Sequence, residues 1–206
     1  MNSENIFLAL KNIKKTIDSN KDEIEKLDQA IGDGDHIFNI QRGLNAALQL
    51  ENELSNLSPQ EVFKKIGMKI MTTVGGSSGA LFATLLMGMA KKYSKELNDL
   101  ENLAAMFYEG VEATKKRGKA DLGEKTMLDV LIPVSLSLND LKNEKNLRIV
   151  AEKIKMDAEE GMLSTKDIMA TKGRASFLGE RAIGHIDPGA RSSQLAITAI
   201  CNEYIN

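Results

Sequence analysis

The stretch DQAIGDGDHIFNIQRG, residues 28–43, organises the rest of the chain. Its three aspartates, Asp28, Asp33 and Asp35, fall within eight positions and are separated by glycines. Carboxylates this close repel one another unless a cation lies among them. Mg²⁺ prefers hard oxygen ligands and completes its shell with water and substrate phosphates. The stretch therefore favours a magnesium site.

The same residues also fit a solvated turn between two helices, since Asp and Gly are expected in turns and helix caps. An EF-hand loop is excluded, because positions 36–39 carry none of the required ligands and no Glu ends the loop. His36, Asn39 and Arg42 recur at helical spacing, so a helix starting near Asp35 directs them toward the acidic turn. The free N–H groups of that helix offer an anion site.

The composition is that of an ordinary globular protein, and we expect one domain over residues 1–206. Apolar residues make up 42%, charged residues 27%, and the net charge of −2 predicts no affinity for nucleic acid or anionic membrane. Lysines at positions 11, 14 and 15 interrupt the first apolar stretch, so no leader is expected. The apolar run 80–90 is too short to span a bilayer. The single Cys201 fits a packed core thiol and a reducing, cytoplasmic location.

Helical periodicity dominates the chain. Ser58-Pro59-Gln60-Glu61 starts a helix with an N-cap, a first-turn proline and a capping box. Strand signals are weak, because aromatic residues make up 4% and no alternating runs are paired by hairpin turns. We therefore predict an all-α domain of about eight helices with antiparallel neighbours, and a kink or shift at Pro133. The expected helices lie near 6–17, 24–31, 36–54, 58–75, 77–93, 100–116, 126–138, 146–162 and 190–204.

The glycine-rich stretch Thr72–Ala80 is a second candidate site. Its glycines permit close backbone approach, and its serine hydroxyls and the next helix N-terminus suit phosphate. A helix–helix turn with serine caps explains the same residues equally well. It is neither a Walker A loop nor a Rossmann fingerprint, since the Gly-Lys-Ser/Thr ending and the preceding strand are absent.

A third stretch, RGKADLGEKTMLD at residues 117–129, predicts a surface turn followed by a capped helix. Lys119 and Lys125 are accordingly expected at the surface. Met127, at the start of an apolar helix, is typical of a core residue, although a thioether can also pack against an adenine ring.

A fourth stretch, residues 171–193, is a long connection carrying Arg174, His185, Asp187 and four glycines. Connections of this length in compact helical domains are usually functional. His185 is either a metal ligand or, more commonly, a hydrogen-bonded structural residue. We expect the four stretches to gather at one end of a helical barrel and to form a Mg²⁺–nucleotide pocket, with the ions neutralising the phosphates.

The motifs, taken in order, resemble the nucleotide-binding L subunit of dihydroxyacetone kinase over essentially the whole chain. They are D-x4-D-x-D-H, N-x2-R-G, GGSSG, RGKADLGEKTMLDVLIP and GRASFLGERAIGHIDPGA. The resemblance implies an antiparallel eight-helix barrel with the nucleotide site in loops at one end. It also implies ADP, or ATP, as cofactor together with two Mg²⁺ ions.

The resemblance assigns roles to individual residues. Asp28, Asp33 and Asp35 match the ligands of the two Mg²⁺ ions, and Arg174 is the one candidate for a catalytic role at the transferring phosphoryl group. Ile37-Phe38 departs from the smaller residues common in relatives. Phe38 beside the acidic turn can reshape the phosphate pocket or the partner-docking surface, so the exact substrate and partner stay open, but not the metal chemistry. The implied nucleotide-binding residues are His36, Asn39, Ser77, Ser78, Gly118, Met127, Arg174, Asp187, Pro188 and Gly189.

The function implied is that of a phosphotransferase subunit, a glycerone kinase component active only with its partner. A separate K subunit holds dihydroxyacetone covalently, and a phosphohistidine-carrying M subunit of the sugar phosphotransferase system recharges the bound ADP. The L subunit of an ATP-dependent ketose or tetrulose kinase and a free-standing nucleotide-sensing regulator remain alternatives, and a homodimer is left open. A fatty-acid kinase, whose similar module is fused to further domains, is not expected.

Overall fold

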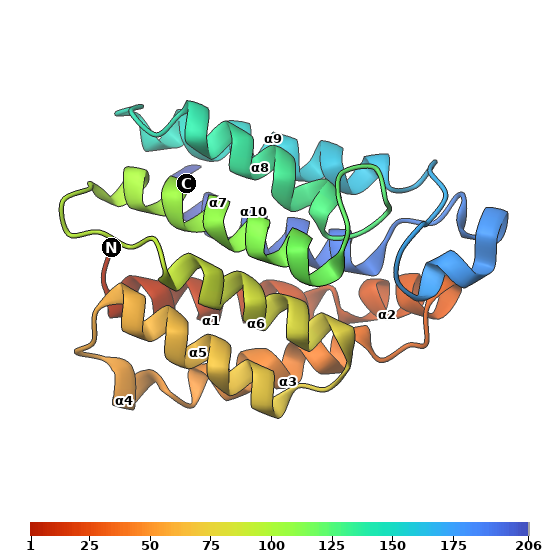
Figure 1. Ribbon diagram of the computed structural model, residues 1–206, viewed down its shortest axis with the longest axis horizontal. Coiled ribbons are helices and arrows are strands. Elements are labelled where there is room, and N and C mark those ends of the chain that lie inside the picture. The colour runs from red at the N-terminus through yellow and green to blue at the C-terminus, as the bar shows by residue number, and fades with distance from the viewer. Residues whose placement is uncertain (206) are drawn as a thin grey trace.

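The computed structural model describes residues 1–205, and its regular elements are helices only, which confirms the all-α prediction. No helix within these residues is long and apolar enough to cross a membrane. The predicted helix 36–54 is interrupted at positions 49 and 50. The elements are α1 (Ser3–Ser19), α2 (Lys21–Ile31), α3 (His36–Leu48), α4 (Glu51–Leu54), α5 (Pro59–Thr73), α6 (Gly76–Ala90), α7 (Asp99–Gly118), α8 (Leu128–Asp140), α9 (Leu147–Ser164), the 3₁₀ segment η1 (Arg174–Ala182) and α10 (Pro188–Ile205) (Figure 1).

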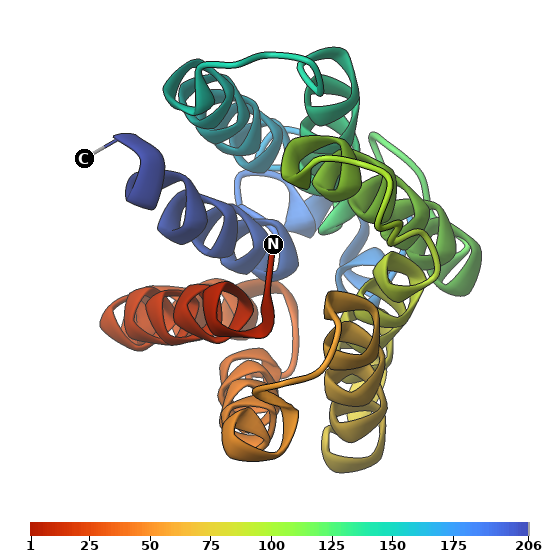
Figure 2. The ribbon, with the colours of Figure 1, turned by 90° about the vertical axis from the view of Figure 1, so that its left-hand side faces the viewer.

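Eight of these helices pack in a closed cycle. Each contacts the next in the order α1, α3, α5, α6, α7, α8, α9, α10, and α10 returns to α1 (Figure 2). The two chain ends lie at the left of Figure 1, and the four connections 32–35, 74–75, 119–127 and 165–187 lie toward the right. The loops that the sequence singled out therefore share one end of the molecule.

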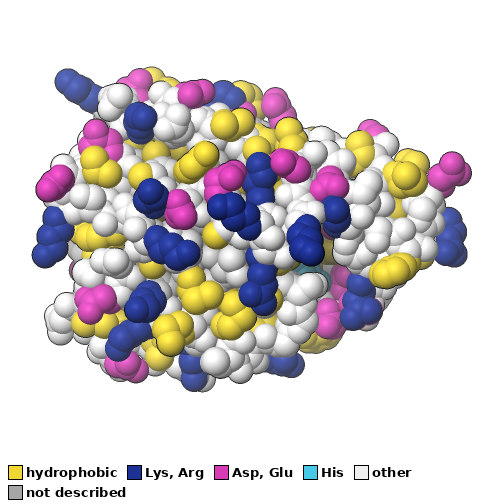
Figure 3. Space-filling model, in the orientation of Figure 1, with side chains coloured by type: hydrophobic (Ala, Val, Ile, Leu, Met, Phe, Trp, Pro, Cys, Tyr) yellow, Lys and Arg dark blue, Asp and Glu magenta, His cyan; other side chains and the backbone are white. Residues whose placement is uncertain are grey.

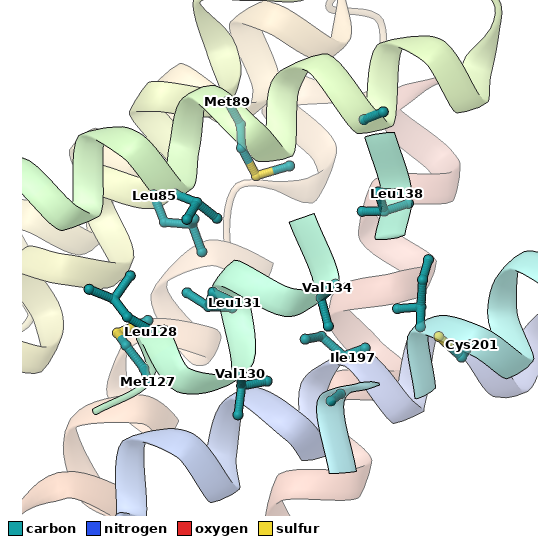
Figure 4. Close-up of a cluster of buried hydrophobic side chains, with 14 of the residues drawn as sticks. Leu85, Met89, Met127, Leu128, Val130, Leu131, Val134, Leu138, Ile197 and Cys201 are labelled. Atoms are coloured by element: carbon teal, nitrogen blue, oxygen red, sulfur yellow. The ribbon is translucent and has the colours of Figure 1, made fainter. Parts of the chain in front are cut away.

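The main core lies between α6, α7, α8, α9 and α10. Leu85 and Met89 of α6 face Leu131 and Val134 of α8 across this core (Figure 4). Each such side chain contributes about 1.5–3 kcal/mol through burial. Cys201 of α10 lies in the same cluster, and burial raises the pKa of its thiol to about 11, so it packs as a neutral core residue.

Helix α8 runs through Pro133, and both of its ends lie two residues later than predicted, whereas the kink or shift expected at Pro133 stays a prediction. Proline has no N–H group, so it cannot bond the carbonyl of Asp129 four residues earlier. That carbonyl oxygen lies only 2.2 Å from the place where a Cβ on Gly161 of α9 would stand. Glycine at position 161 thus allows α9 to approach the backbone of α8 closely at Asp129.

We predict that Gly161→Ala lowers the free energy of unfolding by about 1–3 kcal/mol, because the clash is with backbone that cannot rotate away. The clash outweighs the roughly 1 kcal/mol by which alanine favours a helix. Urea denaturation followed by circular dichroism measures the change. Gly75→Ala is the matched control, since nothing lies within 4 Å of its Cβ position and its φ is −78°. Equal stability of both variants would contradict the close packing of α8 and α9.

Candidate functional site

The α2–α3 turn brings the three predicted metal ligands together. One carboxylate oxygen from each of Asp28, Asp33 and Asp35 lies within 4.8 Å of the other two. Asp28 is buried on α2, whereas Asp33 and Asp35 are exposed in the turn. The Asp28 Oδ2 atom accepts a hydrogen bond of 3.0 Å from the backbone N–H of His36, which holds its carboxylate at the start of α3.

Two glycines make this turn sterically feasible. A Cβ on Gly32 would stand 2.0 Å from Asp28 Oδ1, so any other residue would displace that carboxylate. Gly34 has a φ of +77°, a conformation that side chains rarely adopt. The donor set contains only hard oxygen atoms, as magnesium requires, and the glycines leave room beside them. These residues therefore fit a magnesium ion, and its presence stays a prediction.

His36 links the starts of three helices. Its Nε2 atom lies 3.0 Å from Ser192 Oγ of α10, and its Nδ1 atom lies 3.4 Å from Ser78 Oγ of α6. Burial lowers the pKa of His36, against the opposing effect of the Asp28 carboxylate, so the imidazole is neutral near pH 7. Because serine hydroxyls can donate or accept, they can accommodate either tautomer. The N-termini of α3, α6 and α10, each carrying partial positive charge, are therefore neighbours.

The start of α6 adjoins the acidic turn. Gly76 has a φ of +75°, and its Cβ position lies 3.5 Å from Asn39 Nδ2 and 3.9 Å from Asp35 Oδ2. Asn39 is buried, while Ser77 is exposed at the second position of α6. The serines and amides predicted to bind phosphate thus lie beside the carboxylates predicted to bind metal.

Arg174 reaches the same turn from the long connection between α9 and α10. Its Nη2 atom lies 2.6 Å from Asp33 Oδ2, and its side chain is 68% exposed. Figure 3 shows acidic and basic side chains mixed over this face, with a histidine visible in a recess toward the right-hand end. Arg174 is therefore placed to meet an anion that approaches the turn from solvent.

Asp187 caps the start of α10. Its Oδ2 atom accepts a 2.7 Å hydrogen bond from the Ala190 N–H, and its own N–H donates to Thr165 Oγ1 at 3.0 Å. Pro188 is buried at the first helical position, and the Cβ position of Gly189 lies 3.6 Å from the Met127 Cβ atom. In the structure these predicted nucleotide contacts support the helix start.

Gly118 and Met127 lie at the same end but make no described contact with the three aspartates within residues 1–205. The Cβ position of Gly118 faces Leu81, one turn after Ser77 on α6. Met127 is 5% exposed and belongs to the main core (Figure 4), as expected for a core residue. A contact between Met127 and an adenine ring stays a prediction.

The prediction of a surface position for Lys125 is wrong. Its side chain is 1% exposed, and its Nζ atom donates to the carbonyl oxygens of Thr165 and His185. Lys119 is exposed as predicted. The His185 side chain is exposed and lies outside the carboxylate cluster, the one potential metal-ligand group found among residues 1–205.

Sequence reasoning also missed Ser192 as a partner of His36. Ser192 follows Pro188 by four residues on a helix, and that spacing is the one signal that could have placed it at the site. Phe38, the departure from the family pattern, lies on the outer side of α3 at 47% exposure, with Lys21 Nζ 5.4 Å from its ring centre. It therefore does not enter the space between the carboxylates and α6.

The fold and the site together define the class of protein. It is an all-helical domain with a turn of three carboxylates at the end where its loops gather. The family described as "DAK2 domain" matches residues 30–202, and the chain belongs to that family. It is 42% identical over 199 residues to the "PEP-dependent dihydroxyacetone kinase 1, ADP-binding subunit DhaL" of Listeria innocua, covering 96% of this chain and 94% of the relative.

Two further comparisons agree. A Lactococcus lactis protein named "PTS-dependent dihydroxyacetone kinase, ADP-binding subunit DhaL" is 44% identical, with 86% of this chain and 85% of the relative covered. A crystal structure of the dihydroxyacetone kinase from C. freundii with AMP-PNP and Mg²⁺ superposes with a TM-score of 0.73 at 26% identity. That match covers 96% of this chain and 33% of the solved one. The resemblance to L subunits of dihydroxyacetone kinase is thereby confirmed.

We predict that the stability of the folded protein depends on pH through the Asp187 carboxyl. Burial raises its pKa from 3.8 to about 7, against the opposing Ala190 N–H and Lys125 ammonium. The folded chain therefore holds this proton more tightly than the unfolded chain does, so its contribution to stability falls between about pH 4 and pH 7.

Asp187→Asn keeps an oxygen acceptor but has no proton to lose. The unfolding free energy of the parent minus that of this variant should fall by more than about 1 kcal/mol from pH 5 to pH 8. Urea denaturation at both pH values measures it, with exposed Asp140→Asn as control. A pH-independent difference would contradict the raised pKa.

Proposed function

We propose that this chain is the ADP-binding subunit of a dihydroxyacetone kinase. The observation that carries the proposal is the cluster of Asp28, Asp33 and Asp35, within 4.8 Å of one another, beside three helix N-termini. Carboxylates for metal and amides for phosphate are together the requirements of a magnesium–nucleotide site. The names of the relatives, which specify an ADP-binding subunit, support the same assignment.

Asp28, Asp33 and Asp35 would hold two Mg²⁺ ions in this proposal. When bound, magnesium supplies positive charge that neutralises nucleotide phosphates. The solved relative in complex with AMP-PNP and Mg²⁺ supports this choice of metal and of nucleotide class. In this proposal, residues 1–206 form one nucleotide-binding domain.

The remaining residues orient the nucleotide. Ser77, Ser78 and the amides at the start of α6 bind phosphate oxygens, and neutral His36 with Asn39 fixes the neighbouring helix starts. Gly118, Met127 and the Asp187-Pro188-Gly189 segment border the rest of the nucleotide. Phosphoryl transfer needs positioning and charge stabilisation more than covalent chemistry, so the site requires no protein nucleophile. The exposed Arg174 guanidinium stabilises the transferring phosphoryl group.

The partners proposed are a K subunit that carries dihydroxyacetone and an M subunit that recharges ADP in place. The PEP-dependent and PTS-dependent names of the relatives support a phosphohistidine donor rather than free ATP. The buried, lone Cys201 fits a reducing cytoplasm.

Native mass spectrometry of protein purified without added nucleotide tests the coenzyme role. Retained mass of ADP with magnesium supports an L subunit recharged in place. An empty protein that exchanges ATP freely would favour an ATP-dependent ketose kinase instead. If addition of purified K and M subunits with a phosphohistidine donor produces no dihydroxyacetone phosphate, the nucleotide-sensing regulator becomes the better assignment.

We predict that Asp35→Ala weakens Mg²⁺-dependent ADP binding by more than about tenfold while keeping the helical fold, because it removes a ligand and relieves carboxylate repulsion. Isothermal titration calorimetry with and without Mg²⁺ measures the affinity, and circular dichroism checks the fold. Asp140→Ala, at the exposed last residue of α8, is the control. Unchanged affinity in Asp35→Ala would remove the metal assignment.

We predict that Arg174→Ala slows phosphoryl transfer in the reconstituted complex by more than about tenfold and weakens ADP binding much less. The guanidinium is exposed at the turn, where it can act on charge that develops during transfer. Single-turnover kinetics and calorimetry separate the two effects. A pure loss of affinity would assign Arg174 to nucleotide positioning alone.

A further inference from the structure

Lys125 is a buried charge whose partners are two backbone carbonyls far apart in the sequence. Its ammonium donates to the carbonyl oxygens of Thr165 and of His185, the latter at 2.5 Å. Thr165 directly follows α9, and His185 lies three residues before α10. Lys125 therefore joins the two ends of the connection 165–187.

The burial of the Lys125 ammonium costs free energy, which its hydrogen bonds must offset. A buried ammonium loses its hydration, and hydrogen bonds must replace it. Burial lowers the pKa of Lys125, and the carboxylates of Asp187, Asp167 and Asp129 act in the opposite direction. Its backbone also adopts a φ of 60°, which is uncommon for a residue with a side chain. An apolar residue would avoid the loss of hydration, but it could not bond both carbonyls.

The preceding residue holds the middle of the same connection. Glu124 Oε1 accepts a 2.9 Å hydrogen bond from Thr171 Oγ1 and lies 3.6 Å from Lys172 Nζ. The backbone N–H of Gly184 donates to the Lys166 carbonyl at 2.8 Å, which brings the two ends of the connection 165–187 together. The apolar cluster of the connection consists mainly of its own alanines packed against Ile31 of α2, so polar contacts contribute much of its order.

We propose that Lys125 is a positioning residue, which clamps the ends of the connection 165–187 so that Arg174 is held beside Asp33. The clamp acts from the 119–127 turn, so it couples two of the loops at the site. Its effect on phosphoryl transfer rests on the proposed function, whereas its effect on loop order does not.

Limited trypsin digestion tests the clamp directly. Lys125→Met keeps most of the length of the side chain but removes the ammonium. Cleavage after Lys172, Arg174 and Arg181, read by mass spectrometry, should then be at least about tenfold faster than in the parent. Lys145→Met, in the exposed α8–α9 connection at the opposite end, is the control and should match the parent. A parent-like cleavage rate in folded Lys125→Met would overturn the clamp.

A double-mutant cycle tests whether Lys125 acts through Arg174. Lys125→Met should slow phosphoryl transfer in the reconstituted complex by about 10- to 100-fold with a smaller change in KM for the partner. Combined with Arg174→Ala, the loss should equal that of the more severe single variant. Losses that multiply would overturn the route through Arg174.

Lys125→Gln keeps the clamp testable if Lys125→Met does not fold. Its shorter, neutral amide stays polar but cannot hold both carbonyls as the ammonium does, so the connection should be cleaved faster with the helical content unchanged, and a parent-like rate would overturn the clamp. If the parent protein transfers no phosphoryl group, the proposed function fails. The trypsin result still decides whether Lys125 orders the connection.

Discussion

Repulsion among the carboxylates of Asp28, Asp33 and Asp35 is the constraint on which the site depends. At separations within 4.8 Å, three negative charges destabilise the turn unless neighbouring groups offset them. The His36 N–H bonds Asp28, and the Arg174 guanidinium pairs with Asp33. One backbone N–H and one guanidinium do not balance three carboxylates, and this imbalance supports the proposal that the turn binds a cation. The rest of the molecule supplies the rigidity that keeps the carboxylates together despite their repulsion.

That rigidity comes from the helix cycle. Because successive helices alternate in direction, every second connection falls at the same end, and the starts of α3, α6 and α10 meet there. His36 contacts Ser78 and Ser192 across this junction, 42 and 156 residues away in the sequence. A buried, neutral imidazole suits this position, since it bonds two hydroxyls without adding a charge. The acidic turn is therefore held in place by contacts with α6 and α10, two helices whose buried side chains pack elsewhere in the molecule.

Local signals predicted the class of fold and the gathering of the four connections at one end of the molecule. The capping box at Ser58–Glu61 is present, and the Asp-Gly turn adopts the conformation that its glycines permit. What the sequence could not indicate depends on distant contacts. Lys125 reads as a surface residue because its partners are carbonyls 40 and 60 residues away, and carbonyls carry no sequence signal. The close approach of α9 to α8 at Asp129 likewise depends on Gly161, a residue of the other helix.

The connection 165–187 shows why a charged residue serves better there than an apolar one. Its ends must be closed over about twenty residues, and its own alanine-rich cluster buries little apolar area to offset the entropy of ordering. A neutral amide or hydroxyl could bond one carbonyl weakly. An ammonium has three N–H groups and forms stronger hydrogen bonds, so one side chain can hold both ends. Placing it on the turn between α7 and α8 makes the order of Arg174 depend on a neighbouring loop of the same site. Positioning of the exposed guanidinium is then a property of the assembled loop end rather than of the connection alone.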